Sequence, residues 1–212
     1  MDNDSIAPST KSKVKSSVQR GIRQNFLDSY PGFEPFIDEI LPKKAQLDSI
    51  KLFGPSPQFP MDIGKEKRKK EKECIANPNP GDRPEKSTLY TIDSTPLFYQ
   101  PQDGPPIPHL KLIHAYPTAL PTIQIDRGAI RFVLSGAALM APGLTSPGGR
   151  LPEKEKALEK GQVVAVVAEG KENACLVGSL KVGTEEMKEK AKGVVMDDGH
   201  YLGDGLWKMP LE

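Results

Sequence analysis

The chain has 212 residues, 37% of them apolar, and its net charge of +1 excludes a strongly basic protein that coats nucleic acid without specificity. Its two cysteines, Cys74 and Cys175, exclude a disulfide-rich scaffold and a zinc site built from cysteines of this chain alone. The apolar run at residues 163–168 is far shorter than the roughly 20 residues of a membrane span, and residues 1–10 lack a secretory signal, so we expect a soluble, cytoplasmic protein with no membrane association.

The N-terminal half begins with a predicted helix that starts near Thr10 or Ser12. Apolar residues recur there every four positions and form one stripe: Val14, Val18, Ile22 and Phe26. The polar face of this helix is basic, which suits either contact with RNA or a partner, or a plain exposed helix. Pro31 and Gly32 end it. A second short helix is predicted over residues 33–41 and a strand over 46–53.

The next segment, residues 54–86, is rich in proline and lysine. Because it has few aromatic residues and many charges, we interpret it as a disordered insertion between the strand at 46–53 and a second strand at 88–99. Its lysine run at 65–73 either touches RNA or is simply solvated. A helix or strand is predicted over 107–116, and prolines after it indicate a boundary between a first domain, 1–120, and a second, 121–212.

The C-terminal part has the pattern of a small β-barrel, with many short strands and two short helices. The first helix is predicted over residues 126–134, with Asp126 near its positive end and Gly136 as its stop. Short strands follow near 138–141. Continuous apolar runs at 162–168 and 174–182 predict a hairpin that is buried on both faces or closed into a barrel. A second helix is predicted to be capped by Thr184, and a last strand is expected at 205–210.

No catalytic constellation emerges from the residues that usually carry chemistry. His109 and His114 are five apart rather than four, and we interpret them as ordinary histidines, partly buried or at the surface. Cys175 lies in an apolar strand and Cys74 in the insertion, so both are expected to be inert. The segment at 143–149 lacks the lysine of a phosphate-binding loop. We therefore expect no catalytic residue, no metal site and no cofactor.

Residues 124–144, QIDRGAIRFVLSGAALMAPGL, resemble the opening of the PUA domain, a small RNA-binding pseudo-barrel. Arg127 and Arg131 are four apart, so we expect them to share a helix face and to neutralise neighbouring phosphates. The expected RNA-binding residues are Arg127, Arg131, Ser135, Gly136, Ala137, Met140, Pro142 and Gly143. The alternative is that the small residues serve only packing, and that one arginine pairs with Asp126 or with a core carbonyl and only braces the helix.

Seven blocks, at 12–22, 30–35, 40–44, 109–117, 142–149, 168–174 and 200–207, together resemble the malignant-T-cell-amplified-sequence family, whose fungal members are called translation machinery-associated proteins. The resemblance implies an α+β fold, in which an N-terminal α/β domain packs on a C-terminal PUA pseudo-β-barrel.

The same resemblance implies a protein without enzymatic activity. Its implied ligands are the rRNA of the small ribosomal subunit and also tRNA, and it is expected to pair with density-regulated protein through its N-terminal domain. The implied roles are tRNA release, subunit recycling, and reinitiation or unconventional initiation. Two alternatives remain open: an accessory or component of an RNA-modification enzyme that docks through its PUA domain, and an adaptor that no longer binds RNA.

Overall fold

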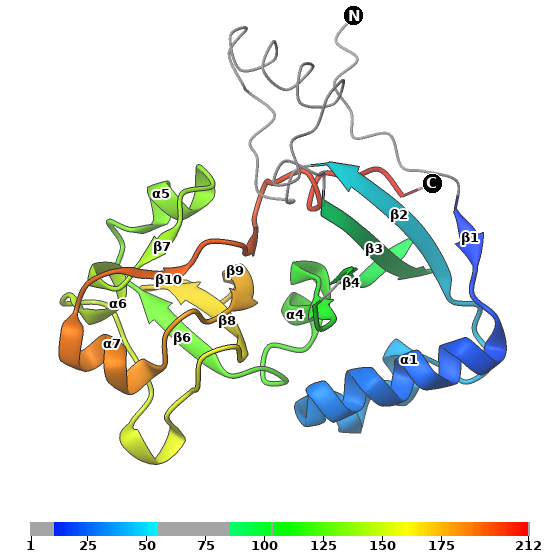
Figure 1. The fold of residues 1–212 in the computed structure, drawn as a ribbon, viewed down its shortest axis with the longest axis horizontal. Coiled ribbons are helices and arrows are strands. Elements are labelled where there is room, and N and C mark those ends of the chain that lie inside the picture. Colours follow the sequence, from blue (N-terminus) through cyan, green and yellow to red (C-terminus); the bar gives the residue numbers. More distant parts are fainter. Residues whose placement is uncertain (1–10, 55–84, 103, 212) are drawn as a thin grey trace, which may run out of the picture.

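The structure is a computed structural model that describes residues 11–54, 85–102 and 104–211. It contains two β-sheet domains that lie side by side, with α4 (Leu110–Ala115) between them (Figure 1). Both helices and strands contribute to each domain, and the strands of the first sheet are all antiparallel. The expected α+β class is confirmed.

The first domain is built on a five-stranded sheet in the order β1-β2-β3-β4-β5. Its strands are β1 (Ser12–Lys13), β2 (Asp48–Gly54), β3 (Glu85–Ile92), β4 (Thr95–Pro101) and β5 (Ile107–Pro108). One face is covered by α1 (Ser16–Ser29), where the ring of Phe26 stacks on Phe98 with centroids 4.8 Å apart. The chain then continues through η1 (Pro31–Phe36) and α2 (Ile37–Ile40), which together occupy the position of the predicted second helix.

Helix α1 starts four to six residues later than predicted. Ser12 and Lys13 pair with β2 instead, so the apolar residue Val14 lies before the helix. Val18 was expected in the apolar stripe, but it is 51% exposed, whereas Phe26 is fully buried. The helix therefore contacts the sheet mainly through its C-terminal half.

The single strand predicted over residues 88–99 is wrong, because β3 and β4 form a hairpin. Asp93 and Ser94 make the two-residue turn, with φ values of 46° and 62°. Turns of this kind usually carry glycine or asparagine. Asp-Ser is an uncommon sequence for them, which explains why the pattern gave no turn signal.

The predicted insertion falls almost entirely on residues 55–84, which lie outside the described residues. Its two ends are described as strand, because Gly54 pairs opposite Glu85 and Phe53 opposite Lys86. The two strands that flank the segment are therefore direct neighbours in the sheet.

The second domain contains a four-stranded sheet in the order β11-β9-β8-β6 and a two-stranded sheet, β10-β7. The strands are β6 (Thr122–Ile125), β7 (Leu139–Met140), β8 (Val163–Ala168), β9 (Ala174–Ser179), β10 (Val194–Met196) and β11 (His200–Tyr201). The helices are α5 (Ile130–Leu134), α6 (Pro142–Thr145), η2 (Lys154–Lys156) and α7 (Thr184–Lys190).

The hairpin of β8 and β9 is confirmed, and both of its faces are buried as predicted. On β8, Val164 and Val166 point into the core of the second domain, whereas Val163 and Ala165 belong to the core that contains Phe26. The same sheet thus supplies one wall of each core, and the two domains share a continuous apolar interface.

Two predictions near the C-terminus are wrong. Thr184 does not cap α7: it is the first residue of the helix after the N-cap Gly183, and its hydroxyl accepts a hydrogen bond from the backbone N–H of Leu158. The strand expected at 205–210 is a series of turns. The carboxylate of Asp204 accepts hydrogen bonds from the backbone N–H groups of Tyr201 and Trp207, which bends the chain there.

The C-terminal segment then crosses back to the first domain, where Leu206 and Met209 are buried in its core. Figure 1 shows this segment in red beside β2 and β3. The last residues of the chain therefore complete a core that begins with α1.

His114 is partly buried as interpreted, but the same interpretation of His109 is wrong. His109 and His200 are both fully buried where the domains meet. Their rings lie 4.4 Å apart, and the ring of Trp207 is parallel to that of His109 at 6.2 Å. The Nδ1 atom of His109 accepts a hydrogen bond from the backbone N–H of Lys111, which caps α4. These histidines thus join the domains.

Candidate nucleic-acid interface

The expected RNA-binding segment begins at a turn organised by Asp126, directly after β6. One carboxylate oxygen of Asp126 accepts hydrogen bonds from the backbone N–H groups of Gly128 and Ala129, at 2.6 and 3.0 Å. The other accepts from the hydroxyl of Ser146 at 2.7 Å. The Ser146 hydrogen bond, followed by the two backbone hydrogen bonds, lowers the pKa of Asp126 although partial burial opposes the shift. The carboxylate therefore stays ionised and holds the turn to the segment after α6.

Close packing explains why residue 143, the second residue of α6, is a glycine. A Cβ atom on Gly143 would lie 3.0 Å from the Cβ of Ala129, and the carbonyl of Gly143 accepts the backbone N–H of Asp126 at 2.8 Å. A larger residue would push the turn away from α6. Gly143 thus sets the distance between the two parts of this surface.

Helix α5 is shorter than predicted, because the residues before Ile130 form the Asp126 turn. Only Val133 of the helix is fully buried, and Gly136 ends the segment with φ of 79°, as expected for a C-terminal stop. The hydroxyl of Ser135 donates to the carbonyl of Phe132 at 2.8 Å.

The expectation that Arg127 and Arg131 share a helix face is wrong, because Arg127 lies in the turn and only Arg131 is helical. A guanidinium nitrogen of Arg127 lies 3.1 Å from the place that a Cβ on Gly170 would occupy, so this side chain extends toward the turn between β8 and β9. The guanidinium of Arg131 instead lies over the ring of Phe132, 4.7 Å from its centroid. The two cations therefore serve different parts of the surface.

The eight expected residues nevertheless occupy one end of the second domain, formed by the Asp126 turn, α5, β7 and α6 (Figure 1). Gly136 and Gly143 are half-buried, and the other six are exposed. Neither arginine has a carboxylate partner within the described part of the chain. An ion pair with Asp126 that braces the helix is therefore not formed there.

Three further exposed cations surround this end of the domain, and sequence reasoning missed them. Arg150 exchanges two backbone hydrogen bonds with Gln124 of β6, Lys171 lies in the turn that Arg127 approaches, and Lys192 precedes β10. Arg150 and Lys171 have no other cation next to them in the sequence, whereas Lys192 continues the series of Lys188 and Lys190. No sequence motif could have indicated them.

The remaining candidates show no site chemistry. The thiol of Cys175 donates to the carbonyl of Val166, and burial raises its pKa to about 11, as its inert interpretation requires. Cys74 lies outside the described residues. Where the chain is described, no group of three or more histidine, cysteine or acidic residues could hold a metal ion, and no helix is long and apolar enough to span a bilayer.

Comparison with known proteins places this surface in a defined domain. The profile of the PUA domain matches residues 121–202, and that of the Pre-PUA-like domain matches residues 4–60 and 63–117. Translation machinery-associated protein 20 of Saccharomyces cerevisiae is 42% identical over 203 residues, which cover 96% of this chain and 94% of the relative. Malignant T-cell-amplified sequence 2 of Homo sapiens is 37% identical over 197 residues, covering 93% and 90%.

Solved structures support the fold. A hypothetical protein from Pyrococcus horikoshii OT3 superposes with a TM-score of 0.61 at 17% identity, covering 94% of this chain and 98% of its own. A PUA domain protein from Aeropyrum pernix K1, solved as a tartrate complex, gives a TM-score of 0.60 at 20% identity, covering 94% and 89%.

Proposed function

Because the chain belongs to the family of translation machinery-associated protein 20 and the malignant T-cell-amplified sequence proteins, we propose that it is a non-enzymatic translation factor that binds the small ribosomal subunit through RNA. The observation that carries this proposal is the exposed end of its PUA domain, where Arg127 and Arg131 have no acidic partner among the described residues. Guanidinium groups without an acidic partner, next to backbone that large side chains do not cover, can donate hydrogen bonds to phosphate oxygens.

The proposed RNA-facing edge consists of seven of the expected residues and the cations near them. The edge comprises Arg127, Arg131, Ser135, Gly136, Ala137, Pro142 and Gly143, with Arg150, Lys171 and Lys192 around it. The small residues allow a sugar–phosphate backbone to come close, and the cations are spread widely enough to contact several phosphates. rRNA is the primary ligand, and tRNA is a second.

The first domain is proposed to bind density-regulated protein. Arg20 of α1 and Lys15, the N-cap of this helix, present exposed basic side chains there, and neither has an acidic partner in the described part of the chain. The heterodimer would act in the cytoplasm in tRNA release, recycling of the small subunit, and reinitiation or unconventional initiation.

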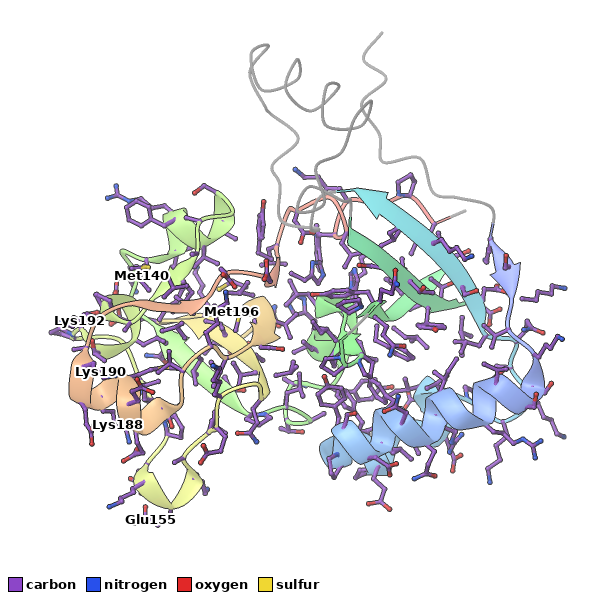
Figure 2. All side chains as sticks on the ribbon, in the orientation of Figure 1. Met140, Glu155, Lys188, Lys190, Lys192 and Met196 are labelled. Carbon is purple, nitrogen blue, oxygen red and sulfur yellow. The ribbon has the colours of Figure 1, made fainter. Side chains whose placement is uncertain are left out.

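The RNA role is tested by the affinity of the full chain for purified small subunits, measured by sedimentation at several salt concentrations. The double variant Arg127→Ala, Arg131→Ala should weaken binding and reduce the slope of log affinity against log salt by about 0.7–0.9 for each lost phosphate contact. The matched control, Lys154→Ala with Lys156→Ala, removes the same charge from η2. Figure 2 shows Glu155 of η2 at the far end of the domain from α5.

An unchanged salt slope for the arginine variant, or an equal loss for the lysine control, would refute the RNA-facing edge. The partner role is tested separately with purified density-regulated protein. Lys15→Glu with Arg20→Glu should weaken that complex and leave the affinity for small subunits unchanged, whereas an intact complex would contradict the assignment to α1.

A further inference from the structure

A cavity of about 320 Å³ lies between the two domains, and no residue of the proposed RNA-facing edge lines it. Its volume is at the lower end of the range, roughly 300–1,000 Å³, of cavities that bind small molecules. The first domain contributes residues of β3, β4 and β5 to its walls. The second contributes the end of β9 and the segments that precede β8 and follow β10. A molecule in this cavity would therefore contact both domains.

Two buried hydroxyl groups of the first sheet line this cavity. Ser87 of β3 is 6% exposed and Tyr99 of β4 is 3% exposed. Ser87 pairs opposite Pro101, which is two residues from Tyr99 on the same strand, so both side chains lie on one face of the sheet. Neither hydroxyl has a hydrogen-bond partner within the described part of the chain. Side-chain polar groups that are this deeply buried are ordinarily hydrogen-bonded, so both hydroxyls indicate a partner outside the chain.

The fold does not require the hydroxyl of Tyr99. Its ring belongs to the core of the first domain and lies edge-on to His200, with centroids 6.2 Å apart. A phenylalanine ring could make the same contacts, and a buried hydroxyl without a partner lowers the stability of a fold. Burial, and next the nearby Asp204, raise the pKa of Tyr99, so its hydroxyl keeps its proton and can donate a hydrogen bond. A ligand that accepts this hydrogen bond would explain why the polar group is present.

The wall formed by the second domain carries charges of both signs. Lys181 and Asp197 form an ion pair there. Lys160 and Asp198 also line the cavity, so its described lining residues include two cations and two acids. A ligand with a net charge would be repelled by one pair as it is attracted by the other, which favours a neutral ligand. Carboxylates beside a ligand also accept hydrogen bonds from ribose hydroxyls, as they do in dinucleotide-binding folds.

The rest of the lining is apolar. Pro101, Pro105 and Ile107 line the cavity on the side of the first domain, and Leu180 lines it on the side of the second. A free sugar would leave these walls without an apolar contact. A nucleotide would bring its phosphate close to the two acids. A neutral molecule with a flat heterocyclic part and several hydroxyl groups matches both the apolar walls and the charged wall.

We propose that this cavity binds a free ribonucleoside. The base lies against the proline and isoleucine side chains of the first domain, and the hydroxyls of Tyr99 and Ser87 donate hydrogen bonds to acceptor atoms of the base. The ribose lies against the second domain, where Asp198 accepts a hydrogen bond from a ribose hydroxyl. Because both domains contact the ligand, its binding stabilises their packing. The site is separate from the proposed RNA-facing edge and does not depend on the proposed function.

The test is calorimetric titration of the full chain with adenosine, guanosine, cytidine and uridine. At least one of the four should bind saturably and raise the melting temperature. Tyr99→Phe removes a single hydroxyl and should weaken this binding about fivefold to tenfold, the loss of one hydrogen bond. Without nucleoside, the same variant should melt at the same temperature as the natural chain or at a higher one. Ser87→Ala should also weaken binding.

Matched controls separate the cavity from the rest of the sheet. Tyr90 of β3 pairs opposite Phe98, so it lies on the other face of the sheet, and Tyr90→Phe should leave binding unchanged. Asp198→Ala changes an exposed residue of the charged wall and should weaken binding, which keeps the test valid should Tyr99→Phe fail to fold. The 2′-deoxynucleoside should bind more weakly than the ribonucleoside, and the 5′-monophosphate should bind no more tightly.

Several results would overturn the proposal. The absence of saturable binding by all four nucleosides is one, and tighter binding of a 5′-monophosphate or of a free amino acid is another. If a uridine 12-mer binds in a manner that depends on Tyr99 whereas the nucleosides do not bind, the cavity belongs to RNA instead. A lower melting temperature of Tyr99→Phe without nucleoside would assign the hydroxyl to the fold. The effect of the Arg127 and Arg131 variant on small-subunit binding is independent of all these results.

Discussion

The Nδ1 atom of His200 lies 2.7 Å from a carboxylate oxygen of Asp204, and both side chains are buried from solvent. The same carboxylate accepts the backbone N–H groups of Tyr201 and Trp207. One acid thus fixes the histidine at the domain interface and the turn that sends the C-terminal segment to the first domain.

Asp204→Asn is expected to lower the free energy of unfolding by about 2–4 kcal/mol, because it removes the charge from a buried network in which each hydrogen bond depends on the carboxylate. Urea unfolding followed by circular dichroism measures the loss. Asp38→Asn is the matched control: Asp38 is exposed and pairs with Arg23, so its replacement should cost at most about 1 kcal/mol. Equal losses for the two variants would contradict the role of Asp204.

Acid should destabilise the protein through His109. Burial, and next the nearby His200, lower the pKa of His109 to about 2. Below about pH 6.5 the unfolded chain binds a proton at this residue that the folded chain does not, so stability falls as the pH falls. This residue alone should remove about 2 kcal/mol between pH 7 and pH 5.

The variant His109→Asn isolates that contribution, since asparagine can still cap α4 but does not titrate. Its unfolding free energy should depend less steeply on pH between 7 and 5 than that of the natural chain. Parallel pH profiles for the two proteins would exclude His109 as the source of the acid sensitivity.

Two helical glycines should respond oppositely to replacement by alanine. Gly21 of α1 has no atom within 4 Å of where its Cβ would be, so Gly21→Ala should stabilise the protein by about 0.5–1 kcal/mol through helix propensity. On Gly32 the added Cβ would lie 2.3 Å from the carbonyl oxygen of Ala119, so Gly32→Ala should destabilise by about 1–3 kcal/mol. Thermal melting of both variants tests the pair, and a change of the same sign in both would refute the argument.

Residues 55–84 are expected to be dispensable for folding. Gly54 and Glu85 lie opposite each other, so a four-residue Gly/Ser turn can join β2 to β3. Because the loop becomes shorter by about three doublings, the chain should gain up to about 2 kcal/mol in loop closure. Differential scanning calorimetry measures the change. A broad or non-cooperative transition would show that the removed segment packs on the fold.

The sequence predicted those parts of the structure whose conformation is determined by residues close together along the chain. The hairpin of β8 and β9 and the end of α5 at Gly136 follow from local patterns. Asp126 was expected at the positive end of the helix, but it organises the turn before α5 instead. The hairpin at Asp93 was not predicted, because its turn is held by pairing of the flanking strands and its residues are not typical of a turn.

The unpredicted parts depend on residues far apart in the chain. Burial of His109 requires Leu206 and Trp207, almost a hundred positions later. Lys171 and Arg150 approach the Asp126 turn only through the order of the strands. The divergence of Arg127 from Arg131 follows from a helix that starts three residues after Arg127, and a four-residue spacing cannot reveal that start.

Burial of Leu206 and Met209 in the core of α1 has a consequence for biosynthesis. A growing chain emerges from its N-terminus, so the first domain leaves the translating ribosome long before the residues that complete its core have been made. The first domain therefore completes its core only after the second domain has been synthesised. A chain that is truncated before Leu206 would lack both of the side chains that the C-terminal segment adds to this core.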